Sequence, residues 1–185
     1  MPQLSLKGRA LRWLAQREQS RAELRRKLLP HAVAQAQVQG QAQLRAEADP
    51  EADPPSSDES TPAARVESLL DWLEAHQHLS QERFVESRVH ARAPRFGNLR
   101  IRQELKQHQV ALTPDVAQAL RDSELQRAAT VRARKFAEPP SNSAERARQS
   151  RFLAGRGFSP EVIGRVLRSL GRPDGVDDEA KTGAN

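Results

Sequence analysis

The chain has no cysteine among its 185 residues, which excludes a disulfide framework, a thiolate metal site and a catalytic thiol. It also has no Gly-x-x-x-x-Gly-Lys loop, so the sequence does not encode a phosphate cradle of that kind. Carboxylates are plentiful, but their spacing is that of exposed side chains four residues apart on a helix, not that of a paired acid and base. We therefore expect no cofactor, no bound metal and no enzymatic activity.

Aromatic and apolar residues are scarce as well. The chain has no tyrosine, five Phe and two Trp, and hydrophobic residues make up 37% of it. This composition favours small cores that each hold two or three helices together, rather than one large core. No strand pattern of any length appears, so we expect an all-α protein.

Long apolar runs are missing too. None approaches the roughly 20 residues that span a bilayer. The first residues, MPQLSLKGRALRWLAQ, are interrupted by charges and lack the apolar region of a signal peptide. We therefore expect a cytosolic protein without a membrane partner.

One spacing recurs along the chain: an apolar residue, an arginine, a serine, and two further apolar residues. The first copy is Leu14, Arg17, Ser20, Leu24 and Leu28. The last copy, with the same offsets, is Leu153, Arg156, Ser159, Ile163 and Leu167, and a degenerate middle copy is Gly97, Ile101 and Leu105. The pattern describes a helix end, a tight turn and the capped start of a second helix. A repeated small unit cannot bury its own apolar face, so the repetition predicts a stacked helical array, which usually binds and rarely catalyses.

Apolar periodicity and capping residues predict about nine helices. Ser20 and Glu23 form a capping box for the second helix, which we expect to stop near Pro30. The expected helices cover 6–17, 20–30, 64–77, a helix capped by Ser80, 97–108, a helix starting at Thr113, 123–137, 143–154 and a helix starting at Ser159.

These helices group into three predicted three-helix repeats, which cover 1–78, 79–121 and 122–171. The first repeat contains an insert at about 33–63 that is rich in Ala and Gln, then acidic and rich in Pro and Ser. We expect the insert to be disordered, with frayed helix as an alternative for its Ala/Gln part, because it has little apolar surface to bury. Residues 172–185 should form a flexible tail.

The net charge of +6 is unevenly distributed along the chain. Residues 1–30 carry +6 and residues 122–171 carry +5, whereas residues 31–64 carry −5. Most of the basic residues are arginines, which favour bidentate contacts to carboxylate or phosphate. The basic helices therefore either bind an acidic partner, protein or nucleic acid, or form an ordinary solvated face.

The segment from Arg95 to Lys106 concentrates this charge. Gly97 opens a helix whose first turns carry Arg100 and Arg102, and the helix dipole adds to their positive field. The segment is either a site for an acidic partner or an ordinary capped helix. The candidate partner-binding residues over the whole chain are Arg25, Arg26, Lys27, Arg88, Arg92, Arg95, Arg100, Arg102 and Lys106.

Three pairs of side chains have both a structural and a functional interpretation, and we favour the structural one for each. Arg17 and Arg156 each hydrogen-bond carbonyls at the end of their own helix or face a partner. His76 and His78 stabilise a helix C-terminus or ligate a metal. Trp13 and Trp72 are anchors in the core or stack on bases.

Four segments in order carry a family resemblance. They are Ala10-Leu11-x-x-Leu14-x-x-Arg17-x-x-Ser20-x-x-Glu23-Leu24-x-x-Lys27-Leu28, Leu79-Ser80-x-x-Arg83-Phe84, Gly97-x-x-Arg100-Ile101-x-x-Glu104-Leu105 and Phe152-Leu153-x-x-Arg156-Gly157-Phe158-Ser159. The set resembles the RecX regulators of the RecA recombinase over the whole chain except residues 31–64 and the tail. The chain departs from that pattern at Ser80-Gln81, where the family often has an acidic pair, and at Gln109, where it often has Gly. The end of the fifth helix should therefore be less sharply capped.

The resemblance implies an elongated, curved array of three-helix repeats without enzymatic activity. Such proteins lodge in the groove of the RecA–DNA filament and damp its growth, ATPase, strand exchange and coprotease activities. That role implies regulation of homologous recombination, DNA repair and the SOS response by a monomer in the cytoplasm. The alternative is a helix-turn-helix-type module that binds single-stranded or double-stranded DNA directly, because short helices around tight turns describe both.

Overall fold

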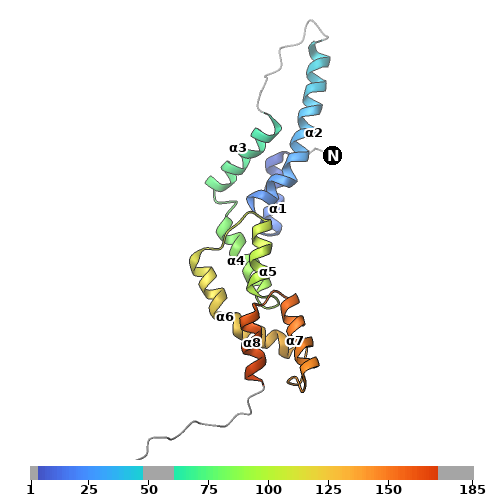
Figure 1. Ribbon diagram of the computed structural model, residues 1–185. Coiled ribbons are helices and arrows are strands. Elements are labelled where there is room, and N and C mark those ends of the chain that lie inside the picture. The colour runs from blue at the N-terminus through green and yellow to red at the C-terminus, as the bar shows by residue number, and fades with distance from the viewer. Residues whose placement is uncertain (1–3, 48–60, 171–185) are drawn as a thin grey trace, which may run out of the picture. The chain divides into compact units, whose positions relative to one another are not determined.

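The computed structural model describes residues 4–47 and 61–170, which contain eight α-helices and no strand (Figure 1). The helices are α1 Leu6–Gln16, α2 Arg21–Glu47, α3 Pro62–Ala75, α4 Gln81–Arg92, α5 Asn98–Gln107, α6 Pro114–Ala133, α7 Ser143–Gly155 and α8 Pro160–Ser169. The all-α prediction is confirmed. The predicted disorder of 48–60 and the predicted tail lie outside the described residues.

The described chain forms two compact units, and the division passes through α4 and α5. The first unit comprises residues 4–47, 61–89 and 104–112, and the second comprises residues 90–103 and 113–170. The boundaries of the three repeats predicted above stay a prediction.

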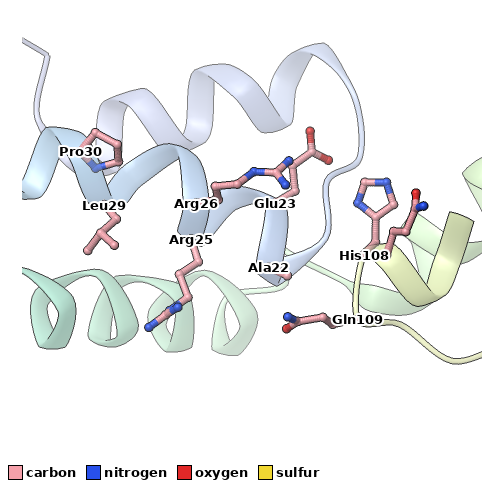
Figure 2. Close-up of a pocket in the computed structure, with 9 residues that line it drawn as sticks. Ala22, Glu23, Arg25, Arg26, Leu29, Pro30, His108 and Gln109 are labelled. Atoms are coloured by element: carbon pink, nitrogen blue, oxygen red, sulfur yellow. The ribbon is translucent and has the colours of Figure 1, made fainter.

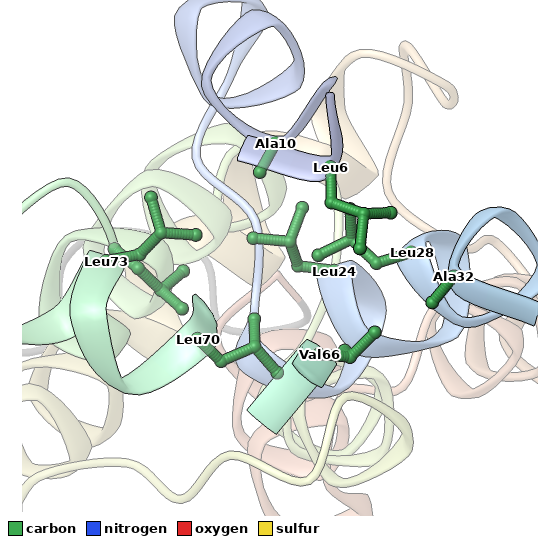
Figure 3. Packing of buried hydrophobic residues seen from close by; sticks show 9 residues of the cluster. Leu6, Ala10, Leu24, Leu28, Ala32, Val66, Leu70 and Leu73 are labelled. Carbon is green, nitrogen blue, oxygen red and sulfur yellow. The ribbon is translucent and has the colours of Figure 1, made fainter. Parts of the chain in front are cut away.

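The core of the first unit comes from α1, α2 and α3 (Figure 3). On α2, Leu24, Leu28 and Ala32 follow each other every four residues and are fully buried. This spacing puts the three side chains on one helix face. They pack with the remaining members of the core, Leu6, Ala10, Val66, Leu70, Leu73 and Leu79. The apolar positions predicted for the second helix, Leu24 and Leu28, are therefore confirmed as core.

The second unit has its own small core. The helices α6, α7 and α8 pack around buried apolar side chains, among them Phe158 in the turn before α8. The members are Ala128, Val131, Leu153, Phe158, Ile163, Val166 and Leu167. Each unit therefore buries a local core, as the low content of large apolar residues predicts.

The predicted stop of the second helix near Pro30 is wrong, because α2 continues through Pro30 to Glu47. Proline removes one backbone N–H, but Pro30 lies on the exposed side of the helix, where water can satisfy the freed carbonyl. The Ala and Gln residues that follow are good helix formers. The first part of the insert expected to be disordered, residues 33–47, is therefore helical.

The predicted break between a sixth and a seventh helix is also wrong. A single helix, α6, runs from Pro114 to Ala133, so the described residues hold eight helices rather than nine. Ser123 lies inside α6, where its hydroxyl donates to the Ala119 carbonyl at 2.7 Å instead of capping a new helix. Leu120, Glu124 and Ala128 form a continuous buried stripe across the expected break.

The predicted hydroxyl caps are confirmed. The second half of the capping box is wrong, because the Glu23 carboxylate bonds Arg17 and Lys27 and not the Ser20 N–H. Hydroxyls accept hydrogen bonds from the backbone N–H three residues later at Ser20, Ser80, Thr113 and Ser159, at 3.1–3.4 Å. Glutamine occupies the left-handed region after two helices: Gln77 has φ 58° after α3, and Gln109 has φ 57° after α5. The Val110 N–H donates to the Leu105 carbonyl at 3.1 Å, so the end of α5 is fully capped, against our expectation.

This conformation suits glycine better than glutamine. We therefore expect Gln77→Gly and Gln109→Gly each to raise the free energy of unfolding by about 0.5–1 kcal/mol. The left-handed conformation costs a residue with a side chain about 1–2 kcal/mol, and glycine avoids this cost. Part of the gain is offset because glycine loses more conformational entropy on folding. Urea unfolding measures the change. A loss of stability in either variant would contradict this account of the two helix ends.

Candidate partner-binding surface

Ion pairs neutralise much of the basic charge of the first unit. Arg21 joins α2 to α3 through Glu67, Asp71 and Glu74, each at 2.7 Å. Hydrogen bonds from Arg21 and Arg25 hold the pKa of Glu67 below its ordinary value. These contacts hold the helices together, so the charges involved are not free for a partner.

The buried carboxylate of Glu23 forms ion pairs with two further cationic side chains. Arg17 ion-pairs with it, and Lys27 lies 3.2 Å away. Burial raises the pKa of Glu23, but the hydrogen bonds from Arg17 and Lys27 outweigh this effect, and the net pKa lies below its ordinary value. Lys27 also contacts Gln19 Oε1 at 2.8 Å, so this candidate residue serves the fold.

A carboxyl with a lowered pKa stabilises the folded state above its unfolded pKa, and that contribution is lost as the pH falls through the folded value. We therefore expect Glu23→Gln to cost about 1–2 kcal/mol at pH 7, where the wild-type carboxylate is ionised. Below the ordinary pKa of a glutamate this contribution shrinks as the pH falls, so the two proteins should be more alike at pH 3 than at pH 7. Urea unfolding at both pH values measures the difference. An equal cost at pH 7 and pH 3 would show that the charge of Glu23 is unimportant.

Among the other candidates of the first unit, Arg25 bonds Glu67, and Arg88 lies 3.2 Å from Glu104. Arg26 and Lys106 are exposed, and their side chains make no hydrogen bond or ion pair with another described residue. Of the candidates in this unit, Arg26 and Lys106 are therefore the ones whose charge is most open to a partner.

Arg26 borders a hollow of about 370 Å³ between α2 and the end of α5 (Figure 2). Leu29 and Pro30 form one end of it, and His108 and Gln109 form the other. Burial and the charge of Arg88 hold the pKa of His108 below its ordinary value, so the imidazole is neutral at pH 7. The hollow thus combines the guanidinium groups of Arg25 and Arg26 and the carboxylate of Glu23 with apolar and neutral polar groups.

In the second unit positive charge dominates. Its described residues contain fifteen Lys and Arg against six Asp and Glu, a net charge of +9. Residues 90–103 contain four arginines and no acid. We call Arg92, Arg95, Arg100, Arg102 and Arg156 the arginine surface. Of these, Arg95, Arg100, Arg102 and Arg156 form no ion pair with a described carboxylate.

The Phe96 ring and backbone carbonyls contact the guanidinium groups of the arginine surface. The guanidinium carbon of Arg100 lies 4.7 Å from the centre of the Phe96 ring, and that of Arg92 lies 5.9 Å away. The Arg156 side chain donates to the Arg95 carbonyl at 3.3 Å and covers the Phe152 ring. Ring and carbonyl contacts orient guanidinium groups without neutralising their charge.

The loop before α5 is fixed to the turn between α7 and α8. Gly97 N–H donates to the Arg156 carbonyl at 2.9 Å, and Leu99 N–H donates to the Gly157 carbonyl at 3.0 Å. A side-chain carbon at Gly97 would lie 2.2 Å from the Gly157 carbonyl oxygen, so only glycine permits this approach. Gly97, which stands in the middle copy where the other two copies have serine, is therefore required for space.

A buried polar network holds the same loop from α6. Glu124 accepts from Asn98 N–H at 3.0 Å and from the Asn98 side chain at 2.9 Å. Arg127 donates to the Phe96 carbonyl at 2.7 Å and to Asn98 Oδ1 at 2.6 Å. Sequence reasoning missed Glu124 and Arg127. The sequence signal that could have identified them is an acidic residue and an arginine three positions apart on the inward face of a helix.

These contacts correct one expectation about α5. The N–H groups of Gly97, Asn98 and Leu99 are already bonded within the protein, and the carboxylate of Glu124 lies against the helix start. The free donors that would let a helix N-terminus hold an anion are therefore taken. Any attraction of this segment for an acidic partner comes from arginine side chains.

The histidine and tryptophan pairs take the structural roles that we favoured, whereas the arginine pair does not bond the carbonyls at its own helix ends. Arg17 binds Glu23 and the Glu18 carbonyl, and Arg156 donates to the Arg95 carbonyl within the arginine surface. His76 Nδ1 lies 2.8 Å from the Trp72 carbonyl at the end of α3, and both His76 and His78 stack on the Trp72 ring. Trp13 and Trp72 pack against the first core.

The part of the chain that the structure describes lacks two further classes of site. It contains no group of three or more His, Asp or Glu side chains arranged to hold a metal ion. None of its helices combines the length and the apolar character needed to cross a membrane.

Comparisons with known proteins agree with this architecture. Residues 80–113 match the second three-helix domain of RecX, and residues 122–167 match the third. Regulatory protein RecX of Leptothrix cholodnii is 47% identical over 169 residues, covering 90% of each chain. Regulatory protein RecX of Ralstonia nicotianae is 45% identical over 167 residues, covering 89% of this chain and 87% of that protein.

A crystal structure of RecX from Lactobacillus salivarius superposes with a TM-score of 0.59, over 89% of this chain and 94% of that one. Sequence identity in that pair is 14%, so the likeness concerns the fold. The fold, the two matched domains and the relatives at 45–47% identity together show that the chain belongs to the RecX family of regulatory proteins.

Proposed function

We propose that this protein modulates the RecA recombinase without catalysing a reaction of its own. It binds the groove of the RecA–DNA filament as a monomer in the cytoplasm. Binding inhibits the ATPase, strand-exchange and coprotease activities of the filament and so regulates DNA repair and the SOS response. The observation that carries the proposal is the arginine surface of the second unit, in which Arg95, Arg100, Arg102 and Arg156 form no ion pair with a described carboxylate.

This surface is suited to a filament because it is basic and already ordered. Backbone hydrogen bonds from Gly97 and Leu99, together with the Asn98–Glu124 contacts, fix the loop that carries Arg95 and the start of α5, which carries Arg100. A binding surface that is rigid before it meets its partner loses little conformational freedom on binding. A nucleoprotein filament offers both carboxylates and phosphates, and guanidinium groups bind either in a bidentate manner.

The remaining candidate residues divide by their intramolecular partners. Arg26 and Lys106 add unpaired charge in the first unit and are proposed as further contacts. Arg25, Lys27 and Arg88 have carboxylate partners within the protein. Their contribution to partner binding should be smaller, because an existing ion pair must be exchanged for a new one.

The proposal is tested by the ATPase of RecA on single-stranded DNA, titrated with this protein. We expect the rate to fall as protein is added, with RecA assembled on the DNA beforehand. An unchanged rate at saturating protein would contradict the proposal.

The second candidate, a module that binds DNA directly, is favoured by the same excess of arginine. It predicts tight binding to bare DNA whose affinity falls steeply with salt, with a slope of about −0.7 per phosphate contact on single strands. Under the filament proposal, affinity for bare single-stranded DNA should be much weaker than affinity for the filament at the same salt concentration.

A further inference from the structure

One large apolar side chain lies exposed within the arginine surface. Leu99, in the first turn of α5, has 54% of its surface exposed, and it is the only large apolar residue exposed to that extent among the described residues of the second unit. Its neighbours Ile101 and Leu105 on the same helix are buried. Leu99 therefore does not belong to the inward face of α5.

The backbone holds Leu99 in place. Its N–H donates to the Gly157 carbonyl at 3.0 Å, and the preceding residue, Asn98, is buried and bonded to Glu124. An exposed leucine on a fixed backbone loses less conformational freedom on binding than one on a mobile loop.

The surroundings of Leu99 are cationic. Arg102 lies one helical turn further along α5 on the same face, and both Arg102 and Arg95 are exposed. Neither of these side chains forms a hydrogen bond or an ion pair with another described residue. The patch thus combines one apolar side chain with guanidinium groups that lack a partner among the described residues.

We propose that Leu99 is the apolar anchor through which the arginine surface binds an acidic protein surface, inserting into an apolar recess flanked by carboxylates. The inference rests on the proposed function and assigns this patch to the protein component of the filament. Phosphates alone offer nothing that would remove a leucine from water. Insertion between bases would require unstacking, which costs a few kcal/mol per step.

The test compares Leu99→Ala with Val38→Ala, a matched loss of an exposed apolar side chain in the first unit, where Val38 is 66% exposed. We expect Leu99→Ala to weaken binding to the RecA filament about tenfold, the effect of burying part of a leucine side chain. Val38→Ala should bind as wild type. The loss in Leu99→Ala should be the same at low and high salt, whereas the loss in Arg102→Gln should shrink as salt rises.

Circular dichroism should show equal helicity in all three variants, because each replaces an exposed side chain. Filament binding by Leu99→Ala equal to that of wild type would overturn the inference while leaving the proposed function intact. An equal loss on bare single-stranded DNA would also overturn it and would favour a wedge between bases. If wild type itself does not bind the filament, the inference fails together with the proposed function.

Discussion

We expect Gly97→Ala to lower the free energy of unfolding of the second unit by about 3–5 kcal/mol. The added methyl group would lie 2.2 Å from the Gly157 carbonyl oxygen and 2.3 Å from the Phe158 nitrogen, both of them backbone atoms. The two segments would have to separate, which adds the loss of two backbone hydrogen bonds to the steric cost. Urea unfolding followed by circular dichroism measures the change.

Gly155→Ala is the matched control for this prediction. Gly155 lies two residues from Gly157 in the chain, but an added carbon at Gly155 would meet nothing within 4 Å. Because Gly155 is the last residue of α7, we expect this variant to be at least as stable as wild type, with a gain of at most about 0.5 kcal/mol. Stability of Gly97→Ala within about 0.5 kcal/mol of wild type would contradict the close packing of the α5 start against the α7–α8 turn.

The largest functional effect is expected from reversing two charges of the arginine surface. Arg100→Glu combined with Arg102→Glu should weaken filament binding by about 2 kcal/mol or more, roughly 30-fold, because the partner's carboxylates are left facing like charges. Affinity for bare single-stranded DNA should fall much less if the protein component dominates. Competition binding against labelled wild-type protein measures both affinities.

The control for this double variant is Arg146→Glu combined with Arg151→Glu. Both arginines are exposed on α7 in the same unit, so the change in net charge is identical. We expect this control to retain most of the wild-type affinity. Equal losses in the two double variants would show that general charge attraction, rather than the arginine surface, accounts for binding.

Local signals in the sequence were sufficient for the parts of the fold that depend on neighbouring residues. The caps at Ser20, Ser80, Thr113 and Ser159 were predictable because each serves the backbone three residues later. The inward faces were predictable because apolar residues spaced three and four apart lie on one face of a helix.

The wrong boundaries arose where a local signal had two meanings. Pro30 is a helix breaker by itself, but it sits on an exposed face within a run of good helix formers. Ser123 is a common cap, but inside α6 its hydroxyl bonds the carbonyl four residues back. Packing of Ala32 in the first unit and of Glu124 and Ala128 in the second decides both cases.

The candidate site was predictable in part. Sequence spacing indicated the basic segment around α5, but not which of the arginines are neutralised, because the carboxylate partners of Arg21 and Arg25 lie 42–53 residues away along the chain. The contact of Gly97 with the α7–α8 turn is equally remote in sequence. Pairing over such distances is a property of the packed structure.

The proposal that the second unit contacts RecA is tested most directly by photo-cross-linking. A photoreactive benzoylphenylalanine replaces Arg95 in one variant, Arg102 in a second and Val38 in a third, all of them exposed positions. After irradiation on the RecA filament, positions 95 and 102 should give covalent adducts with RecA, and position 38 should give none. Adducts from position 38 without any from positions 95 and 102, or adducts with DNA alone, would contradict the assignment of the arginine surface to RecA.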